Sequence, residues 1–263
     1  MPAKKLWLTY LPGKSDLQRL NALMEQLTRY GLTVDGGFWD GNLEKLGWAS
    51  HLEPLKDPSR AQAWLIAGTK ENWEDQDIQY GLSCLYLSLG MERAESLPGF
   101  ALVFSGKLSE DRLPTALKSL EVFSDDDPAW PAKLLASVHR AGVLVSRPYR
   151  IALHANEYLG QWIEVGPSDK QWSGAMLGID QGEITHHGVG PSGFPPERCV
   201  LEYPWRGLKL EVGGIEYTAW AVQNELGPQD SYYVKFTGHP ASIVFGDNPE
   251  IGSGEAFVFR MKA

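Results

Sequence analysis

The first half of the chain alternates between two spacings of its hydrophobic positions. Short apolar runs are typical of strands that are buried on both faces of a sheet, and they occur at residues 6–11, 63–67 and 100–104. Apolar residues three and four positions apart predict amphipathic helices. That spacing occurs at residues 17–27, 78–89, 113–122 and 130–140. This β-α order predicts an open parallel sheet with flanking helices, whose ligands bind at the carboxyl ends of the strands.

From residue 149 onward the helical spacing disappears. About ten short runs of alternating apolar and polar residues replace it, separated by frequent glycine and proline, and such runs are typical of a sandwich or barrel. The runs 208–212 and 215–219 flank Gly213-Gly214, which predicts a two-residue hairpin.

The length of 263 residues, 43% of them hydrophobic, is sufficient for two domains with separate cores. We expect an α/β domain at residues 1–147 and an all-β domain, a sandwich or a barrel, at residues 148–263. The change of spacing places the boundary at residues 143–148.

Composition and charge argue against several classes of partner. No stretch approaches the roughly 18 apolar residues of a spanning helix, and the first residues carry no apolar signal block, so we expect a cytoplasmic protein without a membrane partner. The net charge of −9 counts against nucleic acid as the main partner. Cys84 and Cys199 form no Cys/His pattern, so we expect neither a disulfide nor a metal site.

Three local patterns point to catalysis but are incomplete. Residues 13–15, Gly-Lys-Ser, follow the first predicted strand, but Leu8 stands where a phosphate loop needs its first glycine. Ser105 lacks the flanking glycines of a nucleophile elbow. His186 and His187 have no carboxylate at metal-ligand spacing, and we expect both at the surface.

A series of short motifs follows one another along the first half, at residues 8–10, 31–35, 41–43 and 57–66, at Trp73, Ile78, Tyr80 and Leu82, and at Leu113-Pro114 and residues 127–130. In their order and spacing these motifs resemble those of bacterial TIR-domain proteins. A β-rich extension follows the TIR domain in one bacterial branch, and residues 163–165 with Trp172 are similar to its start.

This resemblance implies a flavodoxin-like, TIR-like sheet and a protein that cleaves or senses NAD-type nucleotides, as in bacterial immunity signalling. The family's essential glutamate corresponds to Asp77, with Glu74 as the alternative if the helix is shifted. A carboxylate suits this chemistry because the ribosyl centre becomes cationic as nicotinamide leaves. Aspartate is one methylene shorter, and a displacement of about 1 Å can lower a rate on the order of 100-fold. The expected enzyme is therefore an NAD glycohydrolase with reduced or no turnover.

The resemblance also implies a nucleotide site around Asp77. Tyr10, Phe38 and Trp39 are candidates for stacking on the nucleotide, with core packing as the alternative, and Gly68 and Trp73 are candidates for lining the site. The segment 35–43 would gate it. Gly81, one helical turn after Asp77, would leave room for the ligand. NAD is then a substrate, and no resident cofactor is required.

Two other function classes stay open. A catalytically inactive TIR-like scaffold or inhibitor would bind another protein through its β domain, in which 14 acidic side chains outnumber 8 basic ones. The resemblance also implies self-association, for which the loop at residues 36–41 is the candidate contact. A lectin with a Rossmann-like appendage would expose a pair of tryptophans on one sheet face.

Overall fold

The computed structural model describes residues 3–11, 16–140, 147–250, 252 and 254–263. The chain folds as two compact units, Met1–Val145 and Ser146–Ala263. The motif at residues 13–15 and most of the expected boundary at residues 143–148 lie outside the described residues. Across the part of the chain that is described, no helix combines the length and the apolar character needed to cross a membrane.

A five-stranded parallel sheet forms the centre of the first unit, with the strand order β2-β1-β3-β4-β5. Strands β1 and β3 are neighbours, and the chain continues outward from them in both directions, so the winding reverses at their carboxyl ends. The strands are β1 (Lys5–Tyr10), β2 (Thr33–Phe38), β3 (Ala63–Thr69), β4 (Gly99–Phe104) and β5 (Glu121–Ser124).

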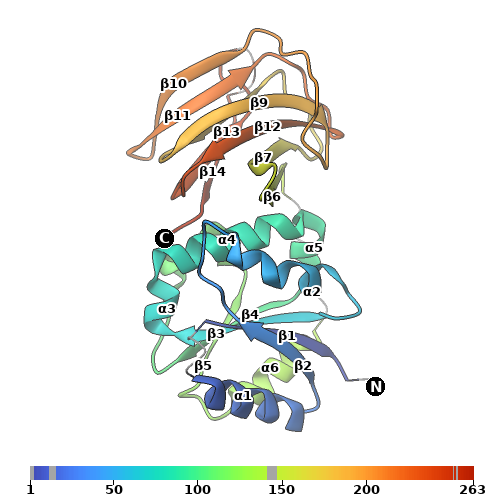
Figure 1. The fold of residues 1–263 in the computed structure, drawn as a ribbon, viewed down its shortest axis with the longest axis vertical. Coiled ribbons are helices and arrows are strands. Elements are labelled where there is room, and N and C mark those ends of the chain that lie inside the picture. The colour runs from blue at the N-terminus through green and yellow to red at the C-terminus, as the bar shows by residue number, and fades with distance from the viewer. Residues whose placement is uncertain (1–2, 12–15, 141–146, 251, 253) are drawn as a thin grey trace. The chain divides into compact units, whose positions relative to one another are not determined.

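Helices cover both faces of this sheet, as Figure 1 shows. One face carries α1 (Leu17–Arg29) and α6 (Trp130–Val138). The other face carries η2 (Gly47–His51), α2 (Leu52–Lys56), α3 (Lys70–Glu74), α4 (Gln76–Leu89) and α5 (Met91–Ser96). Two short turns, η3 (Glu110–Arg112) and η4 (Thr115–Leu117), precede β5. The alternation along β1 divides its side chains between the two faces, because Leu6 and Leu8 join the core under α1 whereas Trp7 contacts η2. The expected parallel sheet with flanking helices is confirmed.

The helix expected at residues 113–122 was wrong. The buried side chains of Leu113, Ala116 and Leu117 have the helical spacing, but only the short turn η4 forms after Pro114. The chain then extends into β5, which pairs with β4 along only four residues. A strand of this length is too short for its own alternation to be recognised.

The second unit consists of two antiparallel sheets. One sheet has the order β6-β7-β12-β9 and the other the order β10-β11-β8-β13-β14. The predicted hairpin is confirmed, since Val212 pairs with Ile215 and both Gly213 and Gly214 have positive φ angles. The strands are β6 (Tyr149–Asn156), β7 (Gly160–Pro167), β8 (Ala175–Ile179), β9 (Glu183–Pro191), β10 (Trp205–Val212), β11 (Ile215–Val222), β12 (Asp230–Thr237), β13 (Ser242–Gly246) and β14 (Ala256–Arg260).

Aromatic contacts join the two sheets of this unit. The ring of Tyr149 on β6 lies 5.0 Å from that of Phe245 on β13. His187 on β9 lies 4.8 Å from Trp220 on β11 and is buried, so its expected surface position was wrong, whereas the neighbouring His186 is exposed. Adjacent residues of a strand point to opposite faces, and the face of His187 is the one that packs on the other sheet.

Candidate functional site

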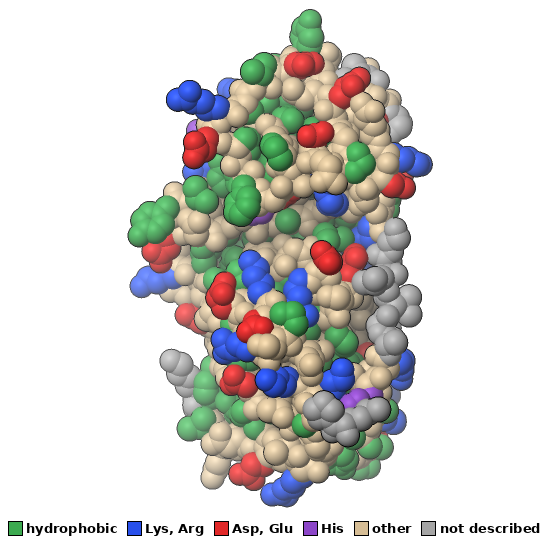
Figure 2. All heavy atoms as spheres, turned by 90° about the vertical axis from the view of Figure 1, so that its right-hand side faces the viewer, with side chains coloured by type: hydrophobic (Ala, Val, Ile, Leu, Met, Phe, Trp, Pro, Cys, Tyr) green, Lys and Arg blue, Asp and Glu red, His purple; other side chains and the backbone are tan. Residues whose placement is uncertain are grey.

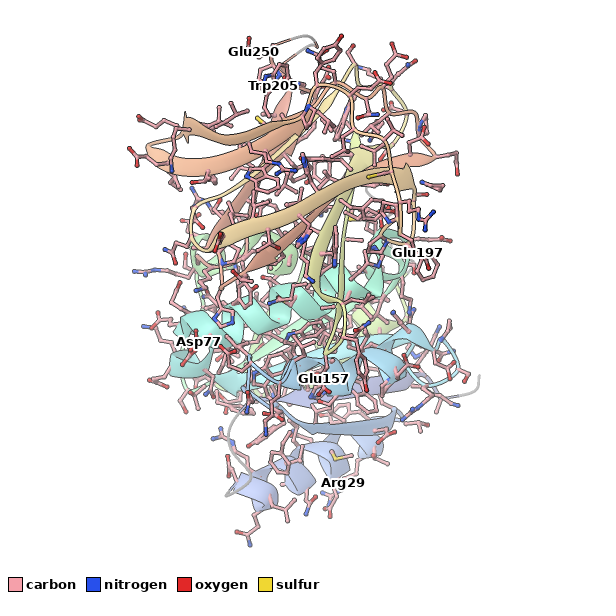
Figure 3. The ribbon with its side chains drawn as sticks, turned by 45° about the horizontal axis from the view of Figure 1, so that its top comes forward. Arg29, Asp77, Glu157, Glu197, Trp205 and Glu250 are labelled. Atoms are coloured by element: carbon pink, nitrogen blue, oxygen red, sulfur yellow. The ribbon has the colours of Figure 1, made fainter. Side chains whose placement is uncertain are left out.

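The start of α4 is fixed by hydrogen bonds that leave Asp77 at the surface. The carboxylate of Asp75 caps the helix and accepts hydrogen bonds from the backbone N–H groups of Asp77 (2.9 Å) and Ile78 (3.0 Å). The buried Gln79 donates through Nε2 to the carbonyl oxygens of Trp73 (2.7 Å) and Arg112 (3.0 Å). The side chain of Asp77 is exposed in the first turn of α4, where Figure 3 labels it.

The segment that follows β2 reaches the same helix. The backbone N–H of Trp39 donates to the carbonyl oxygen of Tyr10 at 2.8 Å, which extends the β-pairing by one residue. The indole of Trp39 lies against Gly81, and a Cβ atom at Gly81 would come within 2.7 Å of it. Gly81 lies one helical turn after Asp77, so Trp39 packs on α4 one turn beyond Asp77. The indole thus occupies the space that we expected a ligand to fill.

His51 holds the other side of the Trp39 indole. The two rings stack with their centroids 5.7 Å apart. His51 Nδ1 accepts a hydrogen bond from Trp7 Nε1 at 3.0 Å, and Nε2 lies 3.2 Å from the carbonyl oxygen of Phe38. An indole N–H only donates, so Nδ1 is the unprotonated nitrogen and Nε2–H donates to Phe38. Burial lowers the pKa of His51, which agrees with this neutral form.

Thr9 extends this network to the central strand. Its hydroxyl accepts from Trp64 Nε1 at 2.9 Å and lies 3.2 Å from His51 Nδ1. Side chains of β1, β3 and η2 therefore fix the position of Trp39. Trp39 Nε1 itself is buried and has no acceptor among the described residues. His51 was missed in the sequence because a lone histidine outside any motif carries no signal.

The other predicted nucleotide contacts lie apart from Asp77. Tyr10 and Phe38 belong to the core on the α1 face of the sheet, opposite α4. Tyr10 is completely buried, its hydroxyl donates to Asp16 at 2.6 Å, and burial raises its pKa. Trp73 is also completely buried, and the side chain of Leu11 fills the space next to Gly68.

The structure thus places Trp39 against α4 one turn after Asp77, and it encloses Tyr10, Gly68 and Trp73 in protein. Phe38 is half-buried, but its ring packs on Tyr10. The role of these residues in nucleotide binding stays a prediction.

A buried carboxylate in the second unit was also missed. Glu164 on β7 lies 2.6 Å from His154 Nε2 and accepts hydrogen bonds from Ser231 Oγ (2.7 Å) and the backbone N–H of Gly193 (3.0 Å). Burial by itself raises the pKa of Glu164, but these hydrogen bonds outweigh it, so the pKa lies below its ordinary value. Ser231 Oγ also accepts from Arg150 at 3.0 Å. Glu164 lies between two apolar residues in the sequence, and that alternation predicts an exposed face.

Comparison of the sequence with protein-family models and with curated proteins finds no match. Among the described residues, no three His, Cys, Asp or Glu side chains gather in a way that could hold a metal ion.

Proposed function

We propose that the first unit is a TIR-like domain that cleaves or senses an NAD-type nucleotide at the start of α4. The observation that carries the proposal is an exposed carboxylate, Asp77, one helical turn before Gly81, the residue of α4 on which the aromatic side chain of Trp39 packs. The strand order β2-β1-β3-β4-β5 is that of flavodoxin-like sheets, which bind nucleotides at the carboxyl ends of their strands.

The two side chains suit the two halves of the reaction. In the hydrolysis of NAD, the bond between ribose C1′ and the nicotinamide nitrogen breaks, water adds to C1′, and a proton is released. The carboxylate of Asp77 stabilises the positive charge that develops on the ribosyl centre. The indole of Trp39, held between Gly81 and His51, borders the site next to this carboxylate. Because aspartate reaches less far than glutamate, we expect slow turnover.

Incubation of the purified chain with NAD, followed by chromatographic detection of nicotinamide, tests this proposal. Asp77→Ala should abolish nicotinamide release, and Asp77→Glu should raise it on the order of 10-fold or more by restoring the lost reach. Glu74→Ala is the matched control, because Glu74 is an exposed carboxylate just before α4. Loss of activity in Glu74→Ala but not in Asp77→Ala would move the catalytic role to Glu74.

The second candidate is an inactive TIR-like scaffold or inhibitor that binds another protein through the β-rich unit. The enclosure of Tyr10, Gly68 and Trp73 favours it, because a nucleotide enzyme needs an open crevice there. So does the loop between β9 and β10, where Phe194 and Val200 are 83% and 81% exposed. Figure 2 shows hydrophobic side chains on the surface of the second unit, in the upper part of the view.

The two candidates are separated by one pair of experiments. The scaffold is supported if the wild type and Asp77→Glu both release no nicotinamide while the wild type retains a protein partner that Phe194→Ser loses. A bound partner that is insensitive to Phe194→Ser would remove this loop as the binding surface.

A further inference from the structure

A cavity of about 240 Å³ lies in the first unit between α1 and α6. It is on the face of the sheet opposite α4, so it is distinct from the surface around Asp77. Its position at the carboxyl ends of β4 and β5 is where open α/β sheets bind ligands. The wall includes Arg19, Leu23, Leu102, Phe104, Asp125 and Trp130.

A cation and a carboxylate stand side by side in this wall. Arg19 Nη2 lies 3.0 Å from Asp125 Oδ2, and the two side chains are 41% and 27% exposed. The guanidinium lies over the ring of Phe104, 3.9 Å from its centroid. The second oxygen of Asp125 accepts from the backbone N–H of Ser105 at 2.7 Å, and Ser105 has a positive φ of 55°. Both charges are therefore held in place by neighbours.

The pair has unused hydrogen-bonding capacity toward the cavity. A guanidinium has five N–H donors. Within the described residues, Asp125 is the one acceptor that Arg19 meets, and only through Nη2. A half-exposed ion pair contributes little to stability. Stability therefore does not account for this ion pair, whereas binding of a ligand does.

Apart from Gln26, the remaining wall is apolar. Leu23, Leu102 and Trp130 are buried side chains that border the cavity. Sites for drug-sized ligands have volumes of about 300–1,000 Å³, so a cavity of about 240 Å³ fits a smaller molecule.

We propose that this cavity binds an α-amino acid with an apolar side chain, such as leucine. The carboxylate of the ligand takes the free N–H groups of Arg19, its ammonium takes Asp125, and its side chain lies on Leu102 and Trp130. A simple anion meets repulsion from Asp125, and a simple cation meets repulsion from Arg19. Only a ligand that carries both charges next to an apolar group satisfies the whole wall. This site does not depend on the proposed nucleotide activity.

Isothermal titration calorimetry of the full chain tests the ligand class. We expect L-leucine to bind, and isocaproate and isoamylamine, which each lack one of its charged groups, to bind at least about 10-fold more weakly. Asp125→Asn keeps an acceptor for the Ser105 N–H but removes the charge, and it should weaken leucine binding by a similar factor.

A second pair of variants tests the place of binding. Ala22 lines the cavity from the exposed side of α1, so Ala22→Leu should fill it and reduce the affinity for leucine at least about 10-fold without harming the helix. Asn21→Leu, its exposed neighbour, is the matched control and should bind as the wild type does. The proposal is overturned if no heat is detected with L-leucine or L-phenylalanine up to about 10 mM. Equal binding of isocaproate, or unchanged affinity in Ala22→Leu, would also overturn it.

Discussion

Two buried histidines, one in each unit, are kept neutral by their surroundings. His51 uses Nδ1 as an acceptor for the Trp7 indole, so a proton on that nitrogen would face another N–H group. His187 has its Nδ1 2.8 Å from the Tyr232 hydroxyl, and its Nε2 is buried without a partner among the described residues. Burial, with a smaller contribution from the positive charge of Arg206, lowers the pKa of His187 to about 4.

We expect His187 to make the second unit less stable in mild acid. Histidine in an unfolded chain has a pKa of about 6.5. Between that value and about 4, the unfolded chain binds a proton that the folded chain does not. Stability is therefore greatest above this window and falls as the pH drops through it. Urea unfolding of the full chain should show a loss of about 1 kcal/mol between pH of about 7.5 and 5.5 that His187→Phe lacks. Equal pH slopes in the two proteins would contradict this.

At the scale of the elements, spacing predicts what a segment forms better than where it packs. Strands β1, β3 and β4 and helices α1 and α4 were predicted from apolar runs and helical periods. The sequence pattern alone does not reveal on which face of the sheet a side chain lies, because this depends on where the neighbouring strands and helices pack. The sequence therefore grouped Tyr10 and Asp77 in one nucleotide site, although they lie on opposite faces of the sheet. The strand β5 and the buried position of Glu164 were not predicted for a similar reason. Strand pairing and packing, rather than the local sequence pattern, determine both.

The contact between α4 and the segment after β2 is testable at Gly81. Alanine is a better helix former than glycine by about 1 kcal/mol. A Cβ at this position would nevertheless come within 2.7 Å of the Trp39 indole. We expect Gly81→Ala to destabilise the chain by about 1–3 kcal/mol in urea unfolding. Trp39→Phe shortens the ring and should reverse most of that loss, which a double-mutant cycle measures. A more stable Gly81→Ala single variant would show that the indole does not pack there.

At the scale of the whole molecule, each unit has its own core. The first unit buries apolar side chains on both faces of a parallel sheet, and the second buries them between two antiparallel sheets. The change of spacing near residue 149 predicts this change of architecture. It does not predict the strand orders of the second unit, since the order of strands in a sheet depends on contacts distant in sequence.

We expect each unit to fold alone. Fragments Met1–Val145 and Ser146–Ala263, expressed separately, should each unfold cooperatively with urea, because each unit is compact and has its own hydrophobic core. Circular dichroism should show helix mainly in the first fragment and strand in the second. A fragment that unfolds without a cooperative transition would mean that it depends on the other for its stability.

The unpaired indole N–H of Trp39 has a consequence for how often the segment after β2 leaves its place. A buried donor without an acceptor raises the free energy of the packed arrangement by about 1–3 kcal/mol relative to one in which water accepts from it. That difference raises the population of the state in which the segment has left its place by roughly 5- to 150-fold, compared with a segment whose buried N–H has an acceptor. The stacking on His51 and the contact with Gly81 act against this tendency. The hydrogen bonding of this segment therefore favours exchange between a closed majority and an open minority.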